Sequence, residues 1–303
     1  MSMYCIGIDG GGTHSRLAGI DTEMNVLGYQ AGGSTNMASG TYESVYENIA
    51  KLLKGFNAET NTLPTECQGI CIGSAGVSVG DNAMLLEKMF REAGFTCKVK
   101  VITDAELVLA AETKGEPGVA IISGTGSIGY AIDKSGNTLR AGGWGHIIDD
   151  GGSGYRIGMD AIQAALMDFD GRGEKTILTK MILEHFQLEK PSDILTLVYG
   201  ANFNKSKIGE AAMLVKDASA NGDIVAAKIE WQASNSLFGL AQALIKRAEL
   251  DAHKLVISGS IITHNENIRS RFCKAIAEDF PGMLITPSST KPELGAAYLA
   301  ARG

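Results

Sequence analysis

The chain has 303 residues, enough for two domains with separate hydrophobic cores. Its net charge of −7, its pI of about 5.3 and the lack of any Lys/Arg block argue against nucleic-acid binding. No apolar run reaches the ~18 residues of a membrane span, and the N-terminus lacks the basic and apolar regions of a signal peptide. The five scattered cysteines fit no zinc or iron–sulfur spacing and are expected to be reduced, so we expect a cytoplasmic protein without a membrane partner.

Strands and helices alternate through the first part of the chain. Strands are predicted at 4–8, 16–21, 24–28, 69–73 and 98–103, and helices at 42–56, 82–93 and 105–112. The run Glu116-Pro117-Gly118 then breaks the pattern, and we place a domain boundary there, with a first domain at 1–116.

A similar pattern follows in the second part. Strands are predicted at 119–122, 128–132, 255–258 and 283–286, helices at 267–279 and 293–301, and a mostly helical insertion at about 155–250. Strands separated by helices indicate an α/β fold. We expect a second domain at 117–303, whose final helix could pack back on the first domain.

The two halves share a local pattern. Residues 8–13 (IDGGGT) and 122–127 (ISGTGS) are each followed, at near-constant spacing, by Asp, Asn, Leu and an Ala-Gly-Gly run. This indicates a duplicated unit of strand, glycine turn and returning strand. Glycine N–H groups, with the hydroxyls of Thr13, Thr125 and Ser127, can bind phosphate oxygens. Either turn alone could be an ordinary hairpin; the matched pair favours a polyphosphate held between two domains that close on the substrate.

Two other phosphate motifs are disfavoured. The chain contains no G-x-x-x-x-G-K-[ST] sequence, so it is not a P-loop protein. Residues 124–129 match the G-x-G-x-x-G dinucleotide fingerprint, but that fingerprint must open a helix. Residues 130–137 instead predict a strand and a hairpin turn.

Two carboxylates lie where strands end. Asp104 joins a predicted strand to a helix and could orient an attacking hydroxyl in phosphoryl transfer; the alternative is a helix N-cap. Asp9 ends the first strand and could hold Mg²⁺ through water, or be a polar strand-end residue.

A second candidate segment is residues 142–154, which combine Trp144, two carboxylates and many turn residues. A planar aromatic ring, together with carboxylates that accept hydrogen bonds from hydroxyls, is typical of a sugar-binding site. His14 and His146 could bind metal, but lone histidines more often make ordinary hydrogen bonds.

These motifs together resemble the N-acetylglucosamine kinases of the BadF/BadG/BcrA/BcrD ATPase group, within the actin/hsp70/sugar-kinase superfamily. The matching blocks, in the family's order over nearly the whole chain, are residues 9–13, 34–36, 103–105, 123–127, 142–145 and 150–153. The resemblance implies two actin-like (ribonuclease H-like) domains with an interdomain cleft. It also implies ATP-dependent, Mg²⁺-dependent phosphorylation of the 6-hydroxyl of N-acetylglucosamine, N-acetylmuramic acid or both.

The resemblance assigns roles to individual residues. The residues that would bind ATP are Gly11, Gly12, Thr13, Thr125, Gly126, Gly259 and Ser260. The residues that would contact the sugar are Asn36, Gly143, Trp144 and Asp150. Asp104 would be the catalytic base for the 6-hydroxyl.

One position departs from the family. The family usually reads Asp-Glu-Gly-Ser, and this chain has Gly151 in place of the Glu, so the family pattern does not fix which sugar is used. Loss of that negative charge would favour a sugar with an acidic ether, such as N-acetylmuramic acid; alternatively, the side chain points outward and Gly151 only eases a turn.

Other functions remain open. They are a glucosamine kinase, a non-catalytic sugar sensor, and an ATPase activator of a 2-hydroxyacyl-CoA dehydratase, whose cluster-binding cysteines have no counterpart in this sequence. We expect a homodimer that acts on a small-molecule amino sugar.

Overall fold

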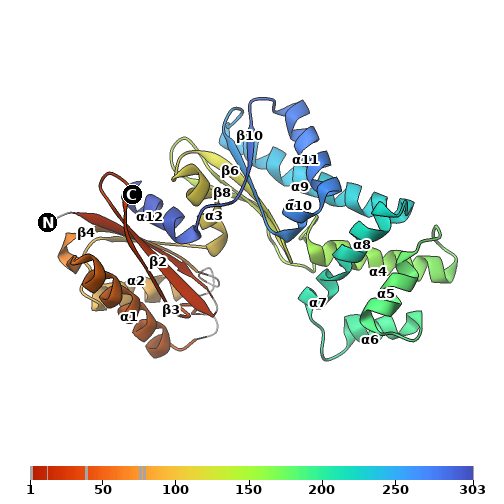
Figure 1. Cartoon of the computed structure of the whole chain (residues 1–303), viewed down its shortest axis with the longest axis horizontal. Helices are drawn as coiled ribbons and strands as arrows, with labels where there is room; N and C mark the ends of the chain where they lie inside the picture. The colour runs from red at the N-terminus through yellow and green to blue at the C-terminus, as the bar shows by residue number, and fades with distance from the viewer. Residues whose placement is uncertain (1–2, 12, 38–39, 75–76, 78–79, 303) are drawn as a thin grey trace. The chain divides into compact units, whose positions relative to one another are not determined.

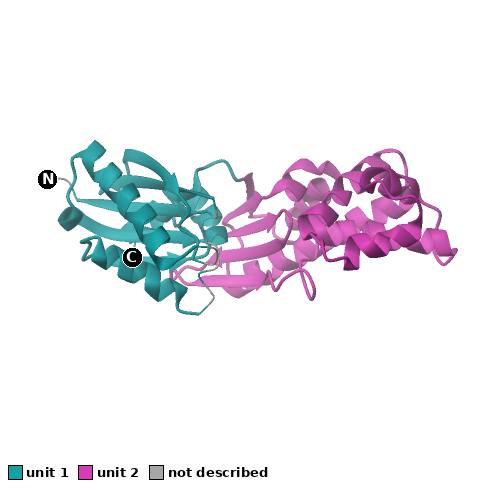
Figure 2. Cartoon of the chain, turned by 90° about the horizontal axis from the view of Figure 1, so that it is seen from below, with its two compact units in different colours: residues 1–117, 288–303 teal, residues 118–287 magenta. Residues whose placement is uncertain are grey.

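The computed structural model describes residues 3–11, 13–37, 40–74, 77 and 80–302. The chain forms two compact units, Met1–Pro117 with Ser288–Gly303, and Gly118–Pro287, which Figure 2 shows in teal and magenta. Each unit is built on its own five-stranded sheet (Figure 1). Among the described residues, no helix is long and apolar enough to cross a membrane.

The first sheet has the strand order β3-β2-β1-β4-β5. Its strands are β1 (Tyr4–Gly10), β2 (His14–Asp21), β3 (Val26–Gly33), β4 (Cys67–Ser74) and β5 (Lys98–Ile102). The first three form an antiparallel meander, whereas β4 and β5 run parallel to β1. The helices of this unit are α1 (Tyr42–Thr60), α2 (Asn82–Glu92), α3 (Asp104–Thr113) and α12 (Pro292–Arg302), with a 3₁₀ turn at Pro64–Glu66.

The two faces of β1 pack in different ways. Tyr4, Ile6 and Ile8 are buried in a core shared with α1 and α2. Gly7 lies on the opposite face against α12, where a Cβ would be 2.0 Å from the backbone nitrogen of Ala297. Glycine therefore lets the helix backbone rest directly on the strand, and Asp9 shares this face.

The second sheet repeats the first. Its strands are β6 (Gly118–Ser123), β7 (Ser127–Ile132), β8 (Thr138–Gly142), β9 (Lys254–Ser258) and β10 (Leu284–Pro287). Read from the meander end, their order is β8-β7-β6-β9-β10, which matches β3-β2-β1-β4-β5 strand for strand. The second sheet has the same antiparallel meander and the same two parallel strands. The internal repeat predicted from the sequence is therefore confirmed at the level of topology.

The repeat extends to the hairpin after the second strand of each meander. The Asp21 carboxylate accepts hydrogen bonds from the Asn25 backbone (2.9 Å) and side chain (3.1 Å). Asp133 makes the same pair of bonds with Asn137 (2.8 and 3.0 Å). Hydrogen bonds from these asparagines lower the pKa of both aspartates. The shared Asp and Asn residues thus encode the same turn twice.

The helical insertion of the second unit packs against its sheet through one long helix. The helices of the unit are α4 (Gly154–Asp170), α5 (Leu178–Phe186), α6 (Ile194–Tyr199), α7 (Lys205–Gly209), α8 (Ala211–Ala220), α9 (Ile224–Ala248), α10 (Ser260–His264) and α11 (Glu266–Asp279), with a 3₁₀ turn at Pro191–Asp193. Helix α9 covers β6, β7 and β8. Strand β8 and the short helix α10 were not predicted as separate elements.

Candidate active site

The first glycine turn leaves β1 at Gly10. Gly11 and Thr13 lie in the turn, whereas Gly12, the other predicted phosphate ligand, lies outside the described residues. Gly10 fits tightly, because a Cβ there would be 2.6 Å from the Thr35 hydroxyl oxygen. The turn therefore needs glycine for close packing as well as for exposing backbone N–H groups.

The segment that carries Asn36 is bound to this turn. The Ser34 hydroxyl donates to the Gly11 carbonyl (3.1 Å), and the buried hydroxyls of Ser15 and Thr35 are 2.8 Å apart. The Asn36 backbone N–H donates back to the Ser34 hydroxyl (3.2 Å). Asn36, a predicted sugar-binding residue, therefore comes directly after Ser34 and Thr35 in the chain, and these two residues contact the predicted phosphate turn or the strand beside it.

Asp9 lies among other carboxylates at the end of β1. Burial raises its pKa, and the nearby charges of Glu293 and Asp104 raise it further, while Arg16, opposite it on β2, lowers it. Glu293, on the first turn of α12, is 2% exposed, and its Oε2 has no hydrogen-bond partner among the described residues. The structure therefore places the predicted base, Asp104, and the predicted metal-binding residue, Asp9, within electrostatic reach of each other.

Asp104 is not the cap of its helix. Helix α3 begins at Asp104, and its N-cap is Thr103, whose backbone N–H donates to the Glu106 carboxylate (3.4 Å). The Asp104 side chain is exposed and, among the described residues, accepts one hydrogen bond, from the Ala105 N–H (3.0 Å). The N-cap alternative is therefore wrong, which leaves the Asp104 carboxylate available to a ligand.

The second glycine turn is tied to the start of α4. Gly124 and Thr125 carbonyls accept hydrogen bonds from the N–H groups of Gly154 (2.7 Å) and Tyr155 (3.2 Å). The Ser127 hydroxyl donates to the Gly151 carbonyl (2.8 Å), and Ser123 donates in the same way to Gly152 (2.8 Å). We expected Ser127 to donate to phosphate, but the structure uses this hydroxyl to hold the loop before α4.

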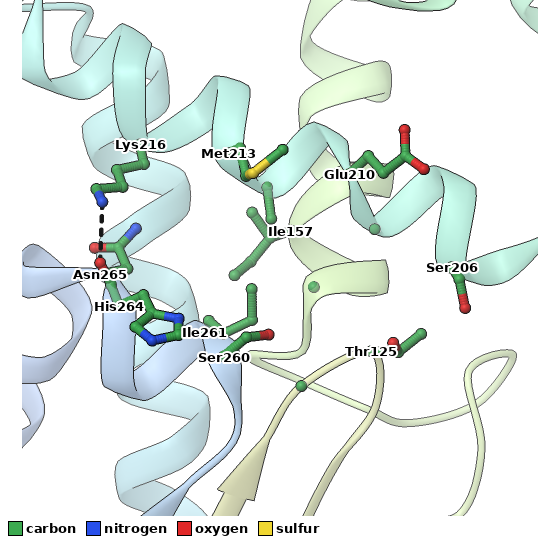
Figure 3. A pocket seen from close by; sticks show the side chains of 14 residues that line it. Thr125, Ile157, Ser206, Glu210, Met213, Lys216, Ser260, Ile261, His264 and Asn265 are labelled. Carbon is green, nitrogen blue, oxygen red and sulfur yellow. Dashed lines mark hydrogen bonds between the residues drawn. The ribbon is translucent and has the colours of Figure 1, made fainter.

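A cavity of about 350 Å³ opens beside this turn (Figure 3). It brings together Thr125 and Ser260, two of the predicted ATP ligands that lie far apart in the sequence. Its apolar wall comes from Ile157, Met213 and Ile261, and its polar residues include Ser206, Glu210, Lys216, His264 and Asn265. Gly259 precedes Ser260 at φ 92°, and a Cβ there would be 2.3 Å from the Ser123 carbonyl oxygen, so this turn requires glycine.

Several lining residues were not predicted from the sequence. The Lys216 ammonium donates to the His264 carbonyl (3.0 Å), as the dashed line in Figure 3 shows. The Asn265 amide donates to Glu230 (2.7 Å), a carboxylate of α9 that is only 1% exposed. These residues lie on helices or at a helix cap, and apolar periodicity predicts the buried face of a helix but says nothing about a ligand.

Asp150 lies against the second glycine turn. Asp150 is 4% exposed, its backbone adopts φ 63°, and a Cβ on Gly126 would be 3.2 Å from its Oδ2. Asp tolerates this left-handed conformation better than most residues. The structure therefore brings a predicted sugar residue beside a predicted phosphate residue.

Trp144 lies apart from the cavity. It is 67% exposed, its backbone N–H donates to Asp149 (3.1 Å), and the Arg140 guanidinium carbon is 3.9 Å from the centre of its ring. Gly143, just before it, adopts φ 71°. Within the second unit Trp144 thus presents most of its aromatic surface to solvent.

His146 packs as an aromatic residue. Its ring centre is 4.9 Å from that of Tyr155 and 6.0 Å from that of Phe203. Across the described part of the chain, no group of three or more His, Cys, Asp or Glu residues could hold a metal ion directly.

Gly151 faces helix α9. A Cβ there would be 3.0 Å from the Cβ and Oγ of Ser236, at a hollow also lined by Asp149, Arg156, Asp160 and Gln232. The positive φ in this stretch belongs to Asp150 and Gly152. A Glu at this position would therefore enter the hollow beside α9, facing two carboxylates and one guanidinium.

Comparison with solved structures defines the class of fold. A crystal structure of a candidate N-acetylglucosamine kinase from Chromobacterium violaceum superposes with a TM-score of 0.69 at 23% identity, covering 98% of this chain and 99% of the other. The fold is the actin-like α/β fold found among sugar kinases, which confirms the predicted fold class.

Sequence comparison defines the family. The model of the BadF/BadG/BcrA/BcrD ATPase family matches residues 6–300, and the chain belongs to this family. An N-acetylmuramic acid/N-acetylglucosamine kinase from Clostridium acetobutylicum is 35% identical over 98% of both chains. An N-acetyl-D-glucosamine kinase from Dictyostelium discoideum is 30% identical over 97% of both. The resemblance inferred from the motifs is therefore confirmed, and ATP use follows from the family.

Proposed function

We propose that this chain is an ATP-dependent kinase that phosphorylates the 6-hydroxyl of an N-acetyl amino sugar, N-acetylglucosamine, N-acetylmuramic acid or both. The observation that carries this function is the cavity at the carboxyl ends of β6 and β9, which brings Thr125 and Ser260 together. The two relatives that match nearly the whole chain, both N-acetyl amino sugar kinases, support the substrate class.

The cavity suits a nucleotide. Ile157, Met213 and Ile261 offer an apolar slot for a base, while Thr125 and Ser260 offer hydroxyl donors for ribose or phosphate. Backbone N–H groups near Gly126 would bind phosphate oxygens, and the turn at Gly11 and Thr13 would do so from the first unit.

The residues near Asp9 fit Mg²⁺, which we include as a cofactor. Mg²⁺ prefers carboxylate and water oxygens, and Asp9 with the unpartnered Glu293 Oε2 supplies hard oxygen donors. The ion would neutralise charge on the transferring phosphoryl group. Asp9 would hold it through water, since the described residues contain no direct three-ligand cluster.

Asp104 would be the catalytic base. As the sugar 6-oxygen forms its bond to the terminal phosphorus of ATP, the carboxylate accepts the hydroxyl proton, and ADP leaves with the electrons of the broken P–O bond. Asn36, Gly143, Trp144 and Asp150 would position the sugar. We further propose a cytoplasmic homodimer that binds neither nucleic acid nor membrane.

An ADP-release assay with Mg-ATP and a panel of sugars tests this function. We expect ADP release with N-acetylglucosamine or N-acetylmuramic acid that far exceeds the release without sugar, and a 6-phosphate in the product by ³¹P–¹H NMR. ADP release that is the same with and without every sugar would contradict the kinase function. Exclusive use of glucosamine would contradict the N-acetyl assignment alone.

A further inference from the structure

Two thiols meet at one end of the first sheet, away from the proposed catalytic residues. Cys67 is the first residue of β4 and is buried, and Cys97 directly precedes β5 and is half-buried. Their sulfur atoms are 3.6 Å apart. Gly69 pairs with Lys98 in the parallel ladder, so the contact is fixed by the register of two neighbouring strands.

The two thiols have unequal environments. The pKa of Cys97 is lowered, first by a hydrogen bond that the Cys67 thiol can donate to its thiolate, and then by the nearby Arg91 guanidinium. That guanidinium also donates to the backbone carbonyls of Phe95 and Cys97, which fixes it beside the thiol. The same contact with Cys97, together with burial, raises the pKa of Cys67. Cys97 is therefore both the more exposed sulfur and the one that ionises first.

We propose that Cys67 and Cys97 form a reversible modification site, a dithiol that a low-molecular-weight disulfide oxidises to an intramolecular disulfide. The Cys97 thiolate attacks one sulfur of the reagent, forms a mixed disulfide and releases one thiolate. Cys67 then loses its proton and attacks the Cys97 sulfur, which releases the second thiolate. The protein loses two protons and two electrons, and the reagent takes them up to become two thiols.

Cys5 is the third thiol of this region and does not compete equally. It is only 6% exposed on β1, and burial, the larger effect, together with the negative charge of Cys97 raises its pKa. The pKa of Cys67 is raised as well, so contact and not acidity separates the two thiols: the Cys67 sulfur lies in van der Waals contact with the Cys97 sulfur. The second step should select Cys67.

The site is separate from the proposed phosphoryl transfer. Cys67 pairs with Tyr4, at the start of β1, whereas Asp9 and Gly10 pair with Gly73 and Ser74, at the other end of β4. A Cys67–Cys97 bond would close a chain segment that contains β4 and α2, which restricts the unfolded state. Oxidation should therefore raise the melting temperature of the protein by a few degrees, while sugar-dependent ADP release stays within about twofold.

The test exposes the full chain to oxidised glutathione at pH 7.5, blocks free thiols with iodoacetamide, and maps the peptides by mass spectrometry. We expect the denatured thiol count to fall from five to three, because two of the five cysteines leave as one disulfide joining residues 67 and 97. Dithiothreitol should restore all five. Five free thiols after oxidation, or a disulfide that uses Cys5, would overturn the proposal.

Single variants separate the two steps. Cys67→Ser should stop at a glutathione adduct on Cys97, and Cys97→Ser should give neither adduct nor disulfide in this region. Cys273, a half-buried thiol of α11 whose pKa burial raises, is the matched control. Cys97 should alkylate about tenfold faster than Cys273 at neutral pH. Equal rates, or an unmodified Cys97 in Cys67→Ser, would contradict the assignment whatever the catalytic activity of the protein.

Discussion

The two sheets of this protein have one topology, but their glycine turns are held in different ways. In the first unit, hydroxyl groups of the segment after β3 contact the turn, and the strand face behind it carries Gly7 and Asp9. In the second unit, the start of α4 is hydrogen-bonded to the turn, and the residues aligned with Gly7 and Asp9 are Ile121 and Ser123. The two units thus share one scaffold, while the residues behind each turn differ.

The surroundings of the two turns differ: carboxylates lie near the first, and a cavity lies beside the second. The first unit places carboxylates near its turn, and one of them, Glu293, has a buried oxygen with no hydrogen-bond partner in the described part of the chain. The second unit uses Ser123 and Ser127 to fix its loop and opens a cavity with an apolar wall. On the proposed function, the first unit would supply the groups that act on protons and the metal ion, and the second would supply most of the nucleotide site.

The largest expected effect is the loss of turnover caused by a substitution in the first unit. Asp104→Asn should leave the fold and sugar binding intact and lower turnover by about 10²–10⁴, the usual range for loss of a general base. Asp81→Asn is the matched control, since Asp81 lies at the start of a helix of the same unit, as the N-cap of α2, and its side chain makes no cap hydrogen bond within the described residues. Steady-state kinetics of both variants decide the point; turnover within a few-fold of the parent for Asp104→Asn would remove it from the mechanism.

The next effect concerns the face of β1 that differs between the units. Gly7→Ala should lower the free energy of unfolding by about 3 kcal/mol, because the new Cβ would overlap the backbone of α12. Ile121→Val, at the aligned position in the second unit, should cost only about 1 kcal/mol. Urea denaturation compares the two variants. If Gly7→Ala proves the milder change, α12 does not rest on β1 as described.

A third prediction uses pH to detect the carboxylates around Asp9. Folding raises the pKa of Asp9, so its ionised form opposes folding, and this penalty develops as pH rises above the unfolded pKa of about 3.9. Asp9→Asn should therefore raise the melting temperature at pH 7, and the gain should vanish near about pH 3, where Asp9 is protonated in both states. The same variant should lose activity. Thermal melts of the variant and the parent at both pH values test this. If Asp9→Asn melts at a lower temperature than the parent at pH 7, burial and the neighbouring carboxylates do not make the Asp9 charge destabilising.

Local patterns predicted most of the scaffold. Glycine runs, the Asp21 and Asp133 hairpins and the alternation of strands and helices appear directly in the sequence, and the family blocks located Asp104 and Asp150. The position of a helix start could not be fixed to one residue, because Thr103 and Asp104 are both good N-caps.

Other features depend on contacts between distant segments. Lys216, His264 and Asn265 reach the cavity only through the packing of α8 and α10, which no local pattern encodes. The meeting of Cys67 with Cys97 depends on the register between β4 and β5. Such features require the tertiary structure because side chains 30 or more residues apart have no local signal that joins them.

The smallest expected effect concerns Gly151 in the second unit, and it rests on the proposed function. Gly151→Glu would put a carboxylate into the hollow beside Ser236, next to Asp149 and Asp160 and near Arg156. We expect the ratio of kcat/KM for N-acetylmuramic acid to that for N-acetylglucosamine to fall by only about two- to fivefold, since the hollow is open to water and Arg156 offsets part of the charge. Gly151→Gln is the control, because it has nearly the same shape without the charge. If Gln and Glu shift the ratio equally, shape and not charge selects the sugar; if neither moves it, the side chain at this position has no part in sugar choice.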